Sequence, residues 1–263
     1  MRDNRLVKAI KYFKPDRSRL EKLAAIAFAL LVWQAGAMLL NNNMLLVTPA
    51  TVIKIICSLL LEGSLLSITG YTLIRIAAGF LMALAIGSIL AIAAGRFHIA
   101  EVILWPFMTA IKSVPVASFI ILCLIWLNSG NLSIFIGFLM VLPIVYTNML
   151  QGIKSTDAKL LEMAELYNVS WLKKLKYIYL PQLKPYIMSA CSVSIGLAWK
   201  AGTAAEVIGI PEGSIGEMLY EAKVYFSSGD LMAWTVIIVA ASIAFEKLFL
   251  LLLKYLYKML ERS

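Results

Sequence analysis

The chain has 263 residues, 61% of them hydrophobic, and its mean hydropathy is +0.85. Soluble domains are only about 45–50% apolar, so the composition excludes a typical soluble enzyme or binding module and predicts an all-α polytopic membrane protein. The net charge of +9 does not indicate a nucleic-acid partner, because the Lys and Arg residues cluster at the ends of apolar segments, where they orient a membrane protein.

Residues 1–22 form a basic arm that holds eight of the chain's 24 Lys and Arg residues. Leu6, Ile10 and Phe13 fall on one helical face of this arm, with lysines around it. The pattern predicts a short helix that lies on anionic membrane lipid at the cytoplasmic surface. A disordered basic tail is the alternative interpretation.

The arm precedes a predicted transmembrane domain, 23–258, and a short cytoplasmic tail, 259–263. This domain contains six apolar segments that approach or reach the roughly 20 residues needed to cross a bilayer. The expected spans are about 23–40, 68–95, a third that ends near 127, 132–150, 185–205 and 231–253. Prolines and a lysine interrupt the third segment, so part of 97–114 is expected to lie along the inner interface.

Charge differs between the loops on the two sides of these spans. Residues 153–184 carry six lysines against three acidic residues, and the arm and the tail are basic as well. Residues 206–230 carry five acidic residues against one lysine, and 41–50 and 128–131 carry no charge. Because positive residues favour the cytoplasmic side, the pattern predicts six transmembrane helices with both termini in the cytoplasm.

Small residues recur every four positions along the second predicted span. They are Gly79, Ala83, Gly87, Ala91 and Gly95. Such a seam lets a second helix approach closely. The sequence leaves open whether that partner helix belongs to the same chain or to a second copy.

The lysine-rich segment before the fifth span has the pattern of two short helices joined by a turn. Residues 157–167 have apolar side chains at helical spacing, and Asn168 suits the left-handed conformation that ends a helix. Ser170 is placed to cap a second short helix over 171–178, and Pro181 is tolerated where the next span starts. We expect a helix–turn–helix elbow, 153–184, on the cytoplasmic face.

This elbow resembles the EAA signature of the permease subunits of binding-protein-dependent ABC importers. The residues that match the signature are Glu162, Ala164, Ile178, Leu180 and Pro181. The chain departs from it twice, with Met163 in place of the signature's first alanine and Asn168 in place of its glycine. Asparagine keeps the left-handed backbone option that the glycine supplies.

Three further stretches resemble the nitrate, sulfonate and taurine branch of these permeases. They are Thr72–Phe80, Trp105–Leu122 and Gly196–Gly209. The resemblance implies a type I ABC importer permease fold in the inner (plasma) membrane of a prokaryote. It also implies a homodimer that works with two cytoplasmic ABC ATPase subunits and an extracytoplasmic substrate-binding protein. The acidic outer loop, 206–230, is the expected receiving surface for that protein, with a solvated loop as the alternative.

The chain has no GxxxxGK[ST] phosphate loop, so we expect it to be a non-catalytic subunit without a cofactor, with ATP bound by the partner ATPase. By family analogy, the elbow sits in a groove of that ATPase. The residues expected to couple the two subunits are Glu162, Met163, Ala164, Tyr167, Asn168, Trp171, Ile178, Leu180 and Pro181. The alternative for Glu162 is a solvated side chain beside Lys159.

Charged residues inside the spans are candidates for the translocation path, because charges are costly in lipid. These candidates are Arg75, Lys200 and Glu206. Arg75 and Lys200 would suit a small anion. The alternative is that the charged side chains extend to the interface or pair within the helix bundle.

A carrier or channel driven by an ion gradient is the second functional class. It does not need the elbow, and the inverted repeats of many carriers are not visible in the sequence. With a single histidine, His98, a membrane enzyme and a histidine-based metal site are disfavoured. The substrate is not identified by the sequence, since importers of vitamin precursors such as a thiamine pyrimidine use similar permeases.

Overall fold

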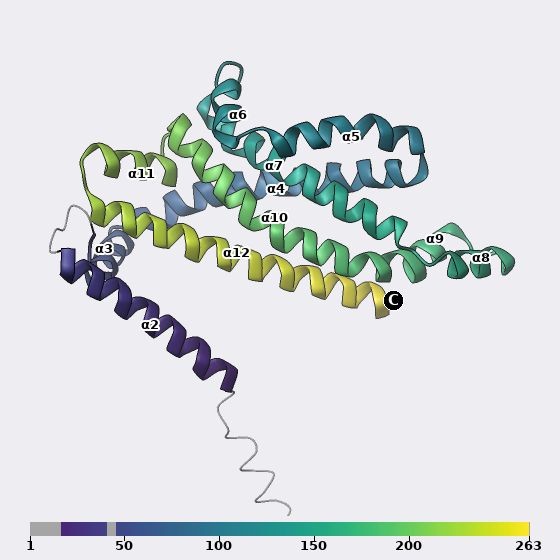
Figure 1. Cartoon of the computed structure of the whole chain (residues 1–263), viewed down its shortest axis with the longest axis horizontal. Helices are drawn as coiled ribbons and strands as arrows, with labels where there is room; N and C mark the ends of the chain where they lie inside the picture. Colours follow the sequence, from purple (N-terminus) through teal and green to yellow (C-terminus); the bar gives the residue numbers. More distant parts are fainter. Residues whose placement is uncertain (1–16, 41–45, 263) are drawn as a thin grey trace, which may run out of the picture.

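The computed structural model describes residues 17–40 and 46–262, and every regular element in them is a helix (Figure 1). The elements are α2 (Arg17–Leu40), α3 (Pro49–Leu61), α4 (Ser64–Arg96), α5 (His98–Ser113), α6 (Val116–Cys123), α7 (Ser129–Lys154), α8 (Ala158–Leu166), α9 (Trp171–Lys174), the π-helix η1 (Leu175–Tyr179), α10 (Leu180–Gly209), α11 (Ile215–Val224) and α12 (Ser228–Arg262). The all-α prediction is confirmed. Most of the predicted N-terminal arm lies outside the described residues.

Among the described residues, four helices are long and apolar enough to cross a membrane, namely α2, α4, α7 and α12. The bent pair α5 and α6 gives a fifth if it counts as one span. α10 has 30 residues but mixes serine, glycine and charged residues with its apolar ones. Neighbouring helices pack along α10, and polar residues of membrane helices tend to face the interior of the helix bundle. Six spans therefore remain a prediction.

Long helices run side by side along the molecule, and the short helices cap its two ends (Figure 1). α7 lies between α4 and α10 and packs against both. The elbow helices α8 and α9 lie at the end where α12 finishes, which the charge pattern assigns to the cytoplasm. α3 and α11 lie at the opposite, outer end. α2 packs on α3 and diverges from the bundle, so most of its side chains are exposed.

The small-residue seam of α4 packs against α7 of the same chain. A Cβ added at Gly79 would lie 2.3 Å from the carbonyl oxygen of Ile134, and one added at Gly87 would lie 3.0 Å from Val145 Cγ1. Backbone therefore approaches backbone along this seam, as the spacing predicts. At Gly79 and Gly87 the partner helix is therefore α7 of the same chain.

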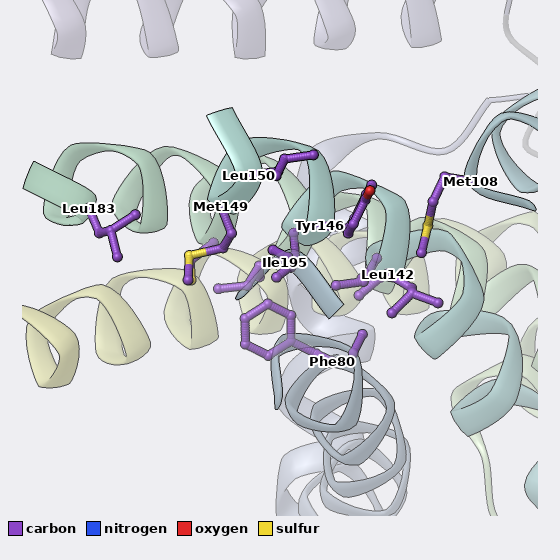
Figure 2. Packing of buried hydrophobic residues seen from close by; sticks show 14 of the residues in the cluster. Phe80, Met108, Leu142, Tyr146, Met149, Leu150, Leu183 and Ile195 are labelled. Atoms are coloured by element: carbon purple, nitrogen blue, oxygen red, sulfur yellow. The ribbon is translucent and has the colours of Figure 1, made fainter. Parts of the chain in front are cut away.

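Side chains from α4, α5, α7 and α10 meet in the main apolar core (Figure 2). The labelled ones are Phe80, Met108, Leu142, Tyr146, Met149, Leu150, Leu183 and Ile195. Phe80 also packs edge-on against Phe249 of α12, with ring centroids 4.9 Å apart. Edge-to-face geometry is a favourable arrangement for aromatic rings. This core fixes α12 against the α4–α7–α10 layer.

The third apolar segment is broken into two helices that meet at 102°. Val114 is extended before Pro115, since proline disfavours helical backbone in the preceding residue. Pro106 lies inside α5 and does not end it. α5 runs alongside α4 and α7 (Figure 1), whereas the sequence predicts part of 97–114 along the inner interface.

Candidate functional site

The elbow begins with a capped helix. The carboxylate of Asp157 accepts a hydrogen bond from the backbone N–H of Lys159 at 2.9 Å, which satisfies one free donor at the start of α8. The N–H of Asp157 in turn donates to the side chain of Gln182 in α10 at 3.3 Å. The predicted first helix is confirmed, and its start is tied to the helix that follows the elbow.

Asn168 ends this helix in the left-handed conformation, with φ of +50°. Its N–H donates to Glu165 O at 3.0 Å, and the N–H of Val169 donates to Ala164 O at 2.9 Å. These two bonds form a Schellman-type end that satisfies carbonyls left free by the helix. The left-handed conformation predicted for Asn168 is confirmed.

The second helix of the elbow is not a separate element, contrary to the sequence prediction of a short helix over 171–178. α9 passes into η1 and then into α10 without a break. Ser170 occupies the cap position, but its side chain makes no capping bond. The elbow is therefore joined to α10 by continuous helical backbone.

Pro181 lies two residues after the end of the π-helix. In a regular α-helix its ring would clash with the carbonyl of Tyr177, and it has no N–H to offer that oxygen. In η1 the hydrogen bonds span five residues, and the N–H of Leu180 donates to Leu175 O. This wider turn accommodates the proline and lets the helix continue.

An exposed apolar face covers the turn of the elbow. Leu166 is 82% exposed and Tyr167 is 78% exposed, and Met163, Trp171 and Leu172 are exposed beside them. Solvent-exposed apolar patches that lie outside the bilayer mark surfaces that bind other proteins. This face lies at the end of the molecule that the charge pattern assigns to the cytoplasm (Figure 1).

The nine predicted coupling residues do not all lie on this face. Those that are exposed are Glu162, Met163, Tyr167, Asn168, Trp171 and Pro181, whereas Ile178 and Leu180 are half-buried. Ala164 is 4% exposed and is therefore not part of the exposed apolar face. In the described part of the chain, no ion pair joins Glu162 to Lys159.

A cavity of about 800 Å³ separates the elbow from the inner ends of α4 and α7. Its lining residues are Ile92, Gly95, Arg96, Ile153, Trp171, Leu175, Tyr179 and Leu183. The cavity is thus shared by the elbow and by the inner ends of α4 and α7.

A buried polar cluster joins three helices at the outer end. Glu206 of α10 is 0% exposed, and the hydroxyl of Thr72 in α4 donates to its Oε2 at 2.9 Å. The N–H of Ile215 in α11 donates to the Thr72 hydroxyl at 3.0 Å. Gly216 packs so closely that an added Cβ would lie 2.3 Å from Glu206 Cβ.

The three predicted path residues are only partly brought together. Arg75 is close enough to Glu206 for Coulombic attraction, although no ion pair between them is found among the described residues. Lys200 is exposed on the flank of α10. The structure therefore gathers Arg75 and Glu206 at the outer end and leaves Lys200 apart from them.

The acidic segment 206–230 is more ordered than the predicted outer loop. α10 continues to Gly209, and α11 occupies Ile215–Val224. Glu206 is buried and does not belong to the loop surface. The remaining acidic residues include Glu221 and Asp230, which line an outer cavity of about 340 Å³ together with Glu62.

The sequence did not predict one hydrogen bond between α10 and α12. Ser192 of α10 donates to Glu246 Oε1 of α12 at 2.5 Å. Glu246 and Lys247 stand inside the apolar run predicted as the last span. A charged residue in such a run is the signal that points to this contact.

Comparison with known proteins identifies the family of the chain. Residues 83–263 match the model of the family described as "Binding-protein-dependent transport system inner membrane component". This region contains the elbow, α10 and α12.

Relatives with transport names align over most of the chain. A Bacillus subtilis (strain 168) protein named as an aliphatic sulfonates transport permease, SsuC, is 28% identical over 85% of this chain and 83% of its own length. The taurine transport system permease protein TauC of Escherichia coli (strain K12) is 26% identical over 85% of this chain and 82% of its own length. The nitrate import permease protein NrtB of Synechococcus elongatus is 26% identical over 59% and 55%. The chain thus belongs to the binding-protein-dependent transport system inner membrane component family, the multi-pass, non-catalytic permease subunits of ABC importers.

Proposed function

We propose that this ABC permease forms the translocation path for a small anion of the sulfonate or nitrate class and that the elbow couples it to ATPase subunits. A second copy of the chain completes the path. A substrate-binding protein delivers the solute to the outer end, where the acidic cavity beside Glu221 and Asp230 is the candidate receiving surface.

The exposed apolar face of the elbow carries this proposal. An apolar face on the cytoplasmic side is costly unless a protein covers it. The elbow is joined through η1 to α10, whose outer end holds Glu206. ATP binding and hydrolysis in the partner subunits would move the elbow, and α10 would pass that movement to the path.

The substrate class rests on the relatives and on charge. The names of SsuC, TauC and NrtB specify sulfonates, taurine and nitrate, which all carry an anionic oxygen-bearing group. Arg75 places a positive charge at the outer end of the bundle. Both observations favour an anion over a cation as the solute.

Copurification tests the coupling surface. A tagged chain expressed in its own host, and extracted in mild detergent, is expected to retain an ATPase subunit that mass spectrometry identifies. Tyr167→Asp should abolish this retention because it places a charge on the apolar face. Leu61→Asp is the matched control, since Leu61 is 89% exposed at the opposite end. Retention of the ATPase by the Tyr167 variant, or uptake that follows an ion gradient without ATP, would contradict the proposal.

A further inference from the structure

A second cavity, of about 340 Å³, opens at the outer end where α4 meets the start of α7. Its lining residues are Tyr71, Ile74, Arg75, Asn128, Gly130 and Asn131. Arg75 is the one charged residue in this set, and the two asparagines supply side-chain amide donors. The volume lies within the range of small-ligand sites.

Arg75 has hydrogen-bonding capacity that the protein does not use. The residue is 7% exposed, and its guanidinium lies 4.6 Å above the ring of Tyr71. Its hydrogen bond from Nη2 to Ser129 O is long, at 3.5 Å, and Nη1 has no hydrogen-bond partner among the described residues. A guanidinium carries five N–H donors, and a buried charge is stable only when it is paired and hydrogen-bonded.

The start of α7 adds a second source of positive potential. Asn128 is extended at the cap position, and its side chain makes no capping bond. The first N–H groups of a helix have no partner inside the helix, and the helix dipole favours an anion beside them. An added Cβ at Gly130 would lie 3.5 Å from Arg75 Nη2, so the start of α7 and the guanidinium are neighbours.

Glu206 attracts the Arg75 guanidinium but forms no ion pair with it among the described residues. Its Oε2 accepts a hydrogen bond from the Thr72 hydroxyl instead. Glu206 does not line the cavity, and no carboxylate does so among the described residues. Arg75 is therefore the only charged residue among the described residues that line the cavity.

We propose that Arg75, Asn128, Asn131 and the start of α7 form a binding site for an oxyanion group such as a sulfonate, nitrate or phosphate. Two sources supply this chemistry, namely the free solute and the phosphate of a lipid headgroup. The solute source rests on the proposed function, whereas the site itself rests on the geometry of the cavity. An anion held here would sit beside the Glu206 cluster that joins α4, α10 and α11.

Thermal unfolding of the purified full-length chain in an uncharged maltoside detergent tests the site. Methanesulfonate, nitrate and phosphate are titrated separately, with ionic strength held constant by sodium chloride. At least one of them should raise the midpoint of unfolding in a saturable way. Removing a charge-assisted hydrogen bond should raise the apparent dissociation constant about tenfold or more, and this is expected for Arg75→Gln and for Asn131→Asp.

Lys223→Gln is the matched control, because it removes one positive charge from an exposed position of the outer helix α11. Its titration should match that of the native chain. Asn131→Asp keeps the test informative if Arg75→Gln does not fold, since Asn131 is exposed and its replacement changes charge with little change in shape. A saturable response that is equal in the native chain and in both cavity variants would overturn the site.

Repeating the titration in lipid nanodiscs that contain phosphatidylglycerol separates the two sources. A response that persists in nanodiscs assigns the site to the solute. A response that is lost in nanodiscs assigns the site to a lipid headgroup if native mass spectrometry also detects a retained lipid. That lipid should be present on the native chain and absent from Arg75→Gln. Absence of both a response and an Arg75-dependent lipid overturns the site. ATPase copurification is measured separately, so failure of the site and failure of the proposed function are distinguishable.

Discussion

Thr72 of α4 donates its hydroxyl hydrogen to the buried carboxylate of Glu206 in α10 at 2.9 Å. This contact joins residues 134 positions apart in the chain, and Ile215 of α11 donates to the same hydroxyl. Thr72→Val keeps the shape of the side chain but leaves both groups without this partner. We expect it to lower the free energy of unfolding by about 1–3 kcal/mol, as measured by dodecyl sulfate titration in mixed micelles.

Thr235→Val is the control for Thr72→Val, because the exposed Thr235 hydroxyl donates only within its own helix, to Leu231 O. Its effect should stay within about 0.5 kcal/mol. Equal losses for the two variants would show that the cluster at Glu206 does not stabilise the outer end.

Gly79→Ala should destabilise the packing of α4 on α7. The added Cβ would lie 2.3 Å from Ile134 O, and backbone atoms cannot move aside locally. Overpacking of this kind costs about 1–3 kcal/mol or more. The matched variant is Gly137→Ala on α7, where no atom lies within 4 Å of the added Cβ. In the unfolding titration, the free energy of unfolding of Gly137→Ala should equal or exceed that of the native chain. If Gly79→Ala were equally stable, α4 and α7 would not pack closely at Gly79.

Asn168→Gly should preserve the elbow, whereas Asn168→Val should distort it. Asn168 has φ of +50°, which glycine adopts freely and which costs a β-branched residue about 1–3 kcal/mol. The readout is the number of ATP molecules hydrolysed per solute taken up by proteoliposomes that contain the complete importer. We expect the valine variant to raise this ratio and the glycine variant to leave it unchanged. If the valine variant kept the native ratio, coupling would not depend on the backbone conformation at Asn168.

Ser192→Ala should weaken the packing of α10 on α12. The serine hydroxyl donates to Glu246 Oε1 at 2.5 Å, and a hydrogen bond of this kind contributes about 0.5–1.5 kcal/mol. Ser189→Ala, at an exposed position of the same helix, is the control. The two variants are compared by the same unfolding titration, and no difference between them would mean that the contact is not stabilising.

The sequence alone predicted the features that depend on residues close together in the chain. Apolar spacing predicted the helix at 157–167, and the backbone preference of asparagine predicted its end at Asn168. The four-residue repeat predicted close packing along α4. In each case one side chain type, or one spacing, determines the structure within a few residues.

Features set by contacts between distant residues were not predictable in the same way. The burial of Glu206 depends on Thr72 and Gly216, which reach it from two other helices. Ala164 is buried, whereas Met163 and Glu165 on either side of it are exposed. A further local signal was missed at α3, where the Thr48 hydroxyl accepts from Thr51 N–H and Pro49 stands at the helix start.

The π-helix at Leu175–Tyr179 connects α9 to α10 without an intervening loop. From Trp171 to Gly209 the chain follows one helical path, roughly 55–60 Å of backbone at 1.5 Å per residue. The elbow and the buried Glu206 of α10 are therefore two parts of one continuous helical path, so a displacement of the elbow would also displace the backbone that carries Glu206.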